Sequence, residues 1–371
     1  MRREQRESSE VGSHTPRGSV LHKTIQLLSV ATATPPFIVS QADAASAAQQ
    51  MFGSRYALYN RMAPVFLTSG IRQRHAVRPI EWFMQARSWP ERTEAYLEGA
   101  LALFVDAATK ALEAAGLLAH EVDAVVTVSS TGIATPSLEA RAMALMGFRP
   151  DIERLPIFGL GCGGGVAGFS VAAKLARAEP GANILLVAVE ICTLSFRLDE
   201  LTKANIVATA LFGDGAAACV LRAGGADGLA YVEASGQHTW PDTLDIMGWR
   251  VDPEGFGVIF AQAIPPFAEA NIGPAVDGIL GRNGLARSDI DRFICHPGGA
   301  KVVTALERSL SLDQGTLDHE RTVLESHGNM LAPTVLFVLE SKLREGLPER
   351  SALLAMGPGF SASCAVLKRA A

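Results

Sequence analysis

One cysteine of this chain lies in an unusual run of glycines. Residues 158–168 read Phe-Gly-Leu-Gly-Cys-Gly-Gly-Gly-Val-Ala-Gly, with Cys162 at the centre. The pattern predicts a short strand at 155–158 and a buried helix at 166–178. A thiol at such a turn faces unpaired N–H groups and the positive end of the helix dipole, which lower its pKa and can hold an oxyanion. The alternative is a small buried cysteine where two helices pack closely.

A cysteine nucleophile needs a partner that holds the thiolate and helps to polarise a carbonyl. His296 ends a predicted strand and enters the turn Pro-Gly-Gly-Ala at 297–300, which would hold an imidazole at the rim of a cleft. A purely structural histidine is the more common case. His327 is the second candidate. Asn329 precedes an apolar run at 333–344, where it either caps a helix or donates its amide to an enolate oxygen.

A second group of polar residues is cationic. Arg61, Arg72, Arg74 and His75 lie close together in the sequence. Such a cluster is usually a solvated face, and the alternative is a contact with the phosphates of an acyl carrier.

Composition excludes several classes of protein. The 371 residues are 48% hydrophobic with a formal net charge of -5, which predicts two domains or a duplicated fold and gives no argument for a nucleic-acid partner. No apolar run reaches the length of about 18 residues that a transmembrane segment needs. Five scattered cysteines favour a reducing cytoplasm. Residues 1–20 lack an apolar run and are predicted to be a disordered tail.

The elements that position these residues alternate along the chain. A first strand is predicted at 25–31, and a helix after Ser40 that runs to Phe52. Three helix-then-strand units follow, at 94–117 with 122–128, 166–178 with 183–189, and 275–284 with 290–295. This alternation indicates an α/β fold with buried central strands.

A weak internal repeat relates the two candidate sites. Cys162 and Asn329 are each followed by an apolar helix, a turn and a strand, so the chain is predicted to contain two copies of one unit facing one cleft. The glycine-rich segment 224–228 suggests the boundary. We expect an N-terminal half at 21–226 with the cysteine, and a C-terminal half at 227–371 with the histidine and the asparagine.

Five motifs, in this order, resemble the type III polyketide synthases, the chalcone-synthase-like branch of the thiolase fold. They are Gly-Cys-Gly-Gly-Gly around Cys162, Leu-Phe-Gly-Asp-Gly-Ala-Ala at 211–217, His-Pro-Gly-Gly at 296–299, Gly-Asn-Met at 328–330 and Gly-Pro-Gly-Phe at 357–360. The resemblance runs from about residue 24 to the C-terminus. It implies a homodimer with a thiolase-like duplicated αβαβα five-layer fold.

The resemblance also implies a reaction with Cys162, His296 and Asn329 as the catalytic residues. An acyl group is loaded from coenzyme A onto the cysteine, malonyl-CoA is decarboxylated, and the resulting enolate attacks the thioester. The histidine and the asparagine amide would stabilise the charge on the thioester oxygen. Chain growth and cyclisation follow in one cavity, and no metal or organic cofactor is implied.

Further roles are implied by motif position. Phe212 and Phe260 resemble two gate residues between a coenzyme A tunnel and the cavity, although they are otherwise ordinary core aromatics. Contacts with coenzyme A are implied for Arg61, Gly298, Gly299 and Ala300. The remaining cavity positions either differ from the residues of the plant enzymes or belong to a hydrogen-bond network that resembles the one biasing ring closure in the family. They are Ser130, Thr135, Glu190, Cys192, Ser195 and Leu331. Thr135 stands where a methionine reaches into the partner subunit.

The small side chains in the cavity suggest a starter. A narrow apolar tunnel past Cys192, Ser195 and Thr135 would hold a fatty acyl chain, extended two or three times to an alkylpyrone or alkylresorcinol; the alternative is a cavity repacked for a compact starter.

Two other functions remain open. A single-condensation 3-oxoacyl-(acyl carrier protein) synthase usually has His-Gln-Ala-Asn at the histidine turn. A non-catalytic acyl-CoA-binding protein would have lost a catalytic residue.

Overall fold

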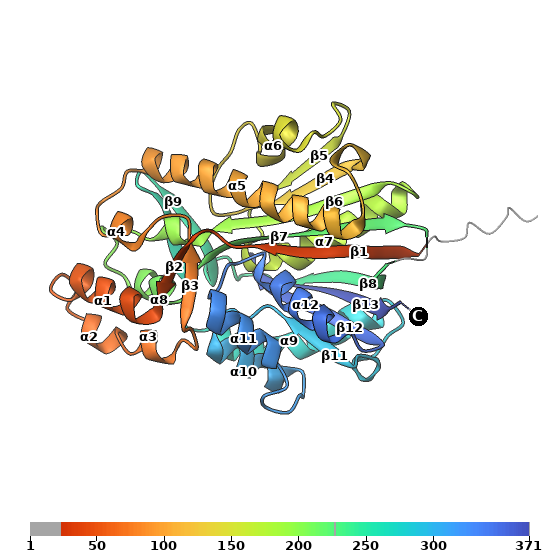
Figure 1. Cartoon of the computed structure of the whole chain (residues 1–371). Helices are drawn as coiled ribbons and strands as arrows, with labels where there is room; N and C mark the ends of the chain where they lie inside the picture. Colours follow the sequence, from red (N-terminus) through yellow and green to blue (C-terminus); the bar gives the residue numbers. More distant parts are fainter. Residues whose placement is uncertain (1–23, 226–227, 371) are drawn as a thin grey trace, which may run out of the picture.

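A computed structural model describes residues 24–225 and 228–370 (Figure 1). The predicted disordered tail at 1–20 and the predicted boundary between 226 and 227 lie outside the described residues.

One large mixed sheet connects both halves of the chain. Its strand order is β11-β12-β13-β8-β1-β7-β6-β4-β5. The strands are β1 (Ile25–Ala33), β4 (Ala124–Val128), β5 (Glu153–Ile157), β6 (Asn183–Ile191), β7 (Asp214–Ala223), β8 (Ala230–Thr239), β11 (Arg292–Cys295), β12 (Arg350–Gly357) and β13 (Ser361–Arg369). The central link is short, because β1 pairs with β8 only over residues 25–27. The sheet therefore consists of two halves, one from each predicted copy.

Helices and half-sheets alternate through the molecule (Figure 1). The outer face of the first half packs on α5 (Trp89–Ala115) and α6 (Leu138–Met146). Between the halves, α7 (Gly164–Ala178) and α12 (Thr334–Glu345) share one core with strands of both. The outer face of the second half packs on α9 (Ile264–Gly281) and α10 (Ala300–Ser309). This arrangement confirms the predicted five-layer αβαβα fold.

Local signals explain where most helices begin and end. The N-terminus of α5 has a capping box, in which Ser88 and Glu91 satisfy each other's backbone N–H groups, and Gly116 ends the helix in the left-handed conformation. Ser40 caps α1 as predicted. The prediction for α9 was wrong at its start, because the helix begins at Ile264 and continues through Pro274.

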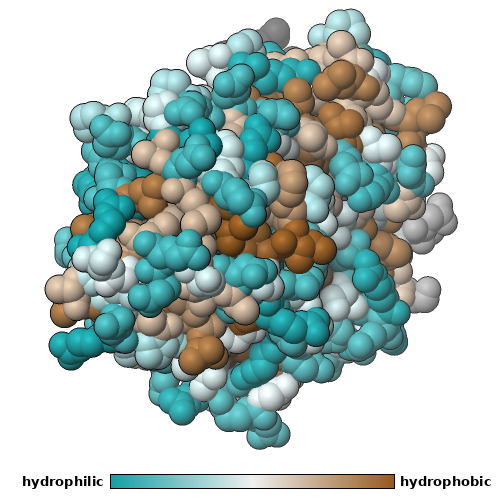
Figure 2. All heavy atoms as spheres, turned by 60° about the vertical axis from the view of Figure 1, so that its left-hand side comes forward, coloured by the Kyte–Doolittle hydropathy of each residue, from teal (hydrophilic) through white to brown (hydrophobic). Residues whose placement is uncertain are grey.

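A smaller region, on the left of Figure 1, covers the end of the first half-sheet. Its elements are β2 (Phe37–Ser40), α1 (Gln41–Phe52), α2 (Tyr59–Met62), α3 (Val65–Thr68), β3 (Gln73–Ala76), α4 (Ile80–Phe83) and α8 (Lys203–Leu211). The hairpin of β9 (Met247–Asp252) and β10 (Gly255–Phe260) and the helix α11 (Asp318–His327) complete the fold. Figure 2 turns the smaller region forward and shows apolar groups gathered at the centre of this face, surrounded by hydrophilic ones.

Within the described ranges, no helix combines the length and the hydropathy needed to cross a membrane.

Candidate active site

Cys162 lies at the predicted turn between β5 and α7. It is buried in a single 3-10 turn, Gly161–Gly163, that leads directly into the helix. The chain approaches the end of β12 so closely that a Cβ atom on Gly357 would lie 2.9 Å from the Gly163 nitrogen. Gly161 has a φ of 47°, which favours glycine. The glycines therefore allow the nucleophile turn to pack against the terminal Gly-Pro-Gly-Phe motif.

Asn329 faces this cysteine from the other half of the chain. Both its Oδ1 and its Nδ2 lie 3.9 Å from the Cys162 Sγ. The Nδ2 also donates to the Gly298 carbonyl (3.3 Å), and the Oδ1 accepts from the Leu331 N–H (2.8 Å). Asn329 does not cap α12, because that helix begins only at Thr334. The expected helix-start position is thus corrected to a turn that precedes the helix.

His296 follows β11 directly, as predicted. The side chain is buried and not at the rim of a cleft as expected, and within the described residues neither ring nitrogen has a hydrogen-bond partner. Burial lowers the pKa of His296 to about 3, so the imidazole is neutral. The turn that follows connects it to Asn329, because the Gly298 carbonyl accepts from the Asn329 side chain. A neutral, unpaired imidazole is free to accept a proton or to donate to a substrate oxygen.

The protonation of Cys162 differs from our expectation. Burial raises the pKa of the thiol to about 12, and the contact with Asn329 offsets this only in part. We predicted a lowered pKa from the helix N-terminus, but the thiol is fully enclosed, and its desolvation outweighs that effect. The cysteine is therefore a thiol at neutral pH, and its proton must leave when an acyl group arrives.

Two pockets lie on either side of the end of α8. The first, which we call the head pocket, has a free volume of about 380 Å³. It is lined by all four residues predicted to contact coenzyme A, Arg61, Gly298, Gly299 and Ala300, and by Phe260. It is also lined by Lys203 and Lys301, which sequence analysis missed. The only sequence signal was the position of Lys301 directly after the histidine turn.

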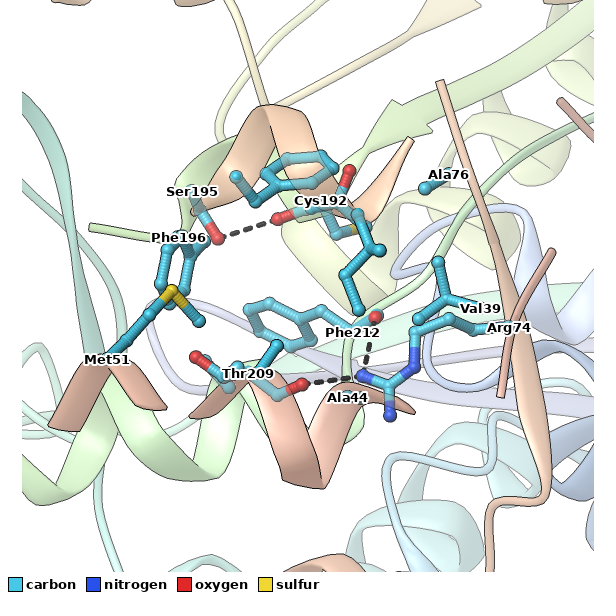
Figure 3. Close-up of a pocket in the computed structure, with 15 residues that line it drawn as sticks. Val39, Ala44, Met51, Arg74, Ala76, Cys192, Ser195, Phe196, Thr209 and Phe212 are labelled. Carbon is cyan, nitrogen blue, oxygen red and sulfur yellow. Dashed lines mark hydrogen bonds between the residues drawn. The ribbon is translucent and has the colours of Figure 1, made fainter. Parts of the chain in front are cut away.

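The second pocket, which we call the tail pocket, is smaller and apolar (Figure 3). Its free volume is about 70 Å³. It is lined by Cys192, Ser195 and Phe212 and by Met51 of α1. The Ser195 hydroxyl donates to the Cys192 carbonyl (2.7 Å) and so offers little polarity to the cavity. The two predicted gate phenylalanines thus border different pockets, and Thr135 and Leu331 line neither.

Comparison with known proteins identifies the family. The N-terminal domain of chalcone and stilbene synthases matches residues 19–226, and the C-terminal domain matches residues 231–370. The chain belongs to the chalcone and stilbene synthase family. It is a type III polyketide synthase, an acyltransferase that performs decarboxylating condensation with malonyl-CoA.

Three relatives show the range of this family. A 1,3,6,8-tetrahydroxynaphthalene synthase of Streptomyces peucetius is 38% identical over 362 residues, 95% of each chain. The alpha-pyrone synthesis polyketide synthase-like Pks18 of Mycobacterium tuberculosis is 30% identical, over 90% of this chain and 88% of its own. The crystal structure of the Streptomyces coelicolor tetrahydroxynaphthalene synthase superposes with a TM-score of 0.88 at 29% identity, covering 93% of this chain and 99% of that one.

In this polyketide synthase the predicted network of Ser130, Glu190 and residue 331 takes another form. The Glu190 carboxylate accepts from the Ser130 N–H (2.9 Å) and the Thr131 hydroxyl (2.7 Å), and burial raises its pKa to about 8. The Ser130 hydroxyl instead accepts from the N–H groups of Gly159 and Gly161. It therefore supports the loop before Cys162, and the structure shows no Ser130 side-chain hydrogen bond to Glu190.

The cationic cluster predicted in the small region is not one face. Arg61 lines the head pocket, whereas Arg72 is exposed and lies 3.6 Å from Glu325. Arg74 is 3% exposed and cannot meet a phosphate in solution. His75 stacks on His327 with ring centroids 5.4 Å apart, and the His327 ring also packs on Phe337. The ring contacts of His327, the second candidate for the catalytic base, are thus with His75 and Phe337.

Proposed function

We propose that this polyketide synthase loads a fatty acyl-CoA starter onto Cys162 and extends it with malonyl-CoA to an alkylpyrone or alkylresorcinol. The observation that supports this starter most is the apolar tail pocket, which Cys192 and Phe212 line and which continues under α1 (Figure 3). Each buried methylene of a tail would contribute up to about 0.8 kcal/mol. The alpha-pyrone relative from Mycobacterium supports the same product class.

The geometry suggests how the three predicted residues divide the work. His296 takes the thiol proton as Cys162 attacks the acyl thioester, and the proton then passes to the departing coenzyme A thiolate, which leaves as the free thiol. When malonyl-CoA then loses carbon dioxide, negative charge develops on its thioester oxygen, and the Asn329 amide with the His296 imidazole stabilises it. The enolate carbon attacks the acyl-cysteine, and the cysteine sulfur is the leaving group. Burial of all three side chains strengthens these interactions by excluding water.

The head pocket is proposed as the coenzyme A site. Arg61, Lys203 and Lys301 provide three cations along its wall, and the backbone at 298–300 lies at its inner end. Phosphate groups bind such cations through charge-assisted hydrogen bonds. Sequence analysis predicted only one cation at this site, Arg61. Lys203 and Lys301 would supply further positive charge.

A homodimer is proposed from the edge of the sheet. The strand β5 is the last in the sheet order, and Leu155 on it is exposed together with nearby Ile133 and Phe158. Unpaired edge strands and exposed apolar groups favour a protein partner. Thr135, in the same loop as Ile133, would lie near this interface. The division at 226/227 and a cytoplasmic location remain predictions from the sequence.

A compact starter is the second candidate. The tail pocket holds only about 70 Å³, so a long chain requires side chains such as Met51 to move. The Trp249 indole donates to the Ser130 carbonyl (2.8 Å) and packs edge-on to Phe212, which adds bulk beside the same wall. A tetrahydroxynaphthalene synthase among the relatives agrees with this alternative.

A panel of starters distinguishes the two candidates. The purified enzyme is given malonyl-CoA with acetyl-, hexanoyl-, dodecanoyl- or aromatic acyl-CoA, and kcat/KM and product masses are measured. We expect kcat/KM to rise with chain length until the pocket is full. A preference for the acetyl or aromatic starter, or efficient synthesis from malonyl-CoA alone, would contradict the fatty acyl proposal while leaving the condensing reaction intact.

A further inference from the structure

Arg74 holds the end of the helix that separates the two pockets. Its guanidinium donates to the carbonyls of Thr209 (2.6 Å) and Phe212 (3.2 Å), as Figure 3 shows, and also to that of Ala210 (3.0 Å). A further N–H donates to the Gln41 side chain of α1. The last carbonyls of a helix have no partner within the helix, and this one side chain satisfies two of them, those of Thr209 and Ala210, together with that of the C-cap residue Phe212.

The remaining carbonyl at this helix end belongs to Leu211, and Asn329 uses it. The Asn329 N–H donates to the Leu211 carbonyl (2.8 Å), and the Asn329 carbonyl accepts from the Gly213 N–H (3.1 Å). The Asn329 backbone is therefore bonded to Leu211 and Gly213, the residues before and after Phe212. Arg74 donates to the carbonyl of Phe212 itself. A shift of the helix end would move the Asn329 amide relative to Cys162.

The surroundings of Arg74 are specialised for this contact. A Cβ atom on Gly213 would lie 3.1 Å from the Arg74 Cβ and 2.4 Å from the His327 carbonyl, so glycine is required where the three segments meet. In the described part of the chain, no carboxylate forms an ion pair with Arg74. Burial lowers its pKa to about 10, and it remains a cation at neutral pH. The Asp214 carboxylate offsets this lowering of the pKa only in part, and keeping a buried charge without a direct ion pair is costly, which suggests a role beyond stability.

We propose that Arg74 is a positioning residue for malonyl-CoA decarboxylation. By fixing the end of α8 it sets the place of the Asn329 amide at Cys162 and the orientation of Phe212 between the pockets. The inference rests on the proposed role of Asn329 in stabilising the enolate. Acyl loading onto Cys162 needs the thiol and His296, which lie on other elements, so it depends less on Arg74.

The test separates the two half-reactions in Arg74→Ala. Loading is measured as acyl-enzyme by intact mass, and decarboxylation as acetyl-CoA formed from malonyl-CoA. A misplacement of about 1 Å costs on the order of 10²-fold in rate, so we expect that loss in decarboxylation with little change in loading. The wild-type enzyme is measured first, because absence of decarboxylation there would contradict the proposed function and not the role of Arg74.

Chemical rescue supplies the decisive control. Removing the side chain opens space beside the tail pocket, which Arg74 lines. Free guanidinium at concentrations below denaturation should restore decarboxylation, whereas ammonium or sodium at the same ionic strength should not. Arg74→Lys should stay impaired, since one ammonium cannot reach three carbonyls and the Gln41 amide together.

Arg92 offers a matched control. It is also buried, and it donates to the carbonyls of Phe196 and Glu254, away from Asn329. We expect Arg92→Ala to lower stability and to leave the ratio of decarboxylation to loading unchanged. Equal losses of both half-reactions in Arg74→Ala, or in Arg74→Lys if the alanine variant does not fold, would overturn the proposal. So would full activity, or rescue by ammonium.

Discussion

The head pocket and the tail pocket lie on either side of the end of α8 but differ in chemistry. The head pocket is the larger and carries three cations, Arg61, Lys203 and Lys301. The tail pocket is smaller and apolar, and the donors of its one cation, Arg74, are directed mainly to backbone carbonyls. This difference suggests that a coenzyme A thioester binds with its charged end on one side and its acyl end on the other, so that the thioester lies near Cys162.

The largest effect is expected at the nucleophile. Cys162→Ala should abolish acyl loading because Cys162 is the cysteine that contacts the Asn329 side chain. Cys219→Ala is the matched control, since Cys219 is equally buried but lies in the central core. Intact mass spectrometry after incubation with an acyl-CoA checks this, and polyketide formation by Cys162→Ala would contradict the mechanism.

Loss of the enolate-stabilising groups should come next. His296→Ala and Asn329→Ala should each lower decarboxylation about 100 to 1000-fold, as is usual for the loss of an oxyanion donor. His327→Ala controls for general damage, because His327 is near in sequence but stacks on His75 and Phe337. If decarboxylation fell as far in the control as in Asn329→Ala, the assignment would be wrong.

Filling the tail pocket should change the starter preference. Ser195→Phe should lower kcat/KM for dodecanoyl-CoA by at least about tenfold, because several methylenes worth up to about 0.8 kcal/mol each lose their place. Activity with acetyl-CoA provides the internal control. Unchanged use of the long starter by this variant would show that the tail lies elsewhere.

The smallest effects are expected in the head pocket. Lys203→Ala and Lys301→Ala should each raise KM for coenzyme A thioesters by a few-fold, since solvent-exposed charge pairs contribute about 0.2 to 1 kcal/mol. The increase should shrink at high salt, and the order of preference among starters should not change. If a lysine variant changed the chain-length preference without changing KM, the separate roles of the two pockets would be contradicted.

Local patterns in the sequence predicted the central features of the site. The glycines around Cys162 indicated the nucleophile turn, and the strand before His296 with the Pro-Gly-Gly turn after it placed the residue at the end of β11, although the expected position at the rim of a cleft was wrong because the side chain is buried. The alternation of helices and strands was sufficient to predict a layered α/β fold, because each element can be recognised from its own residues.

Features that depend on distant segments could not be predicted in this way. Asn329 was expected at a helix start, but its conformation is set by the end of α8, more than 100 residues earlier. Arg74 looked like part of a solvated cluster because its acceptors are backbone carbonyls, which leave no trace in side-chain patterns. The pKa of Cys162 depends on burial by both halves of the chain and outweighed the expected effect of the helix N-terminus.

The measurement that tests the account most directly follows one acyl chain through the site. The enzyme is incubated with dodecanoyl-CoA, and the modified residue is located by peptide mass spectrometry before malonyl-CoA is added. We predict a dodecanoyl group on Cys162 alone, which disappears after malonyl-CoA is added as an alkylpyrone or alkylresorcinol of matching chain length forms. A dodecanoyl group on another residue, or one that remains on Cys162 while malonyl-CoA is consumed, would contradict the account.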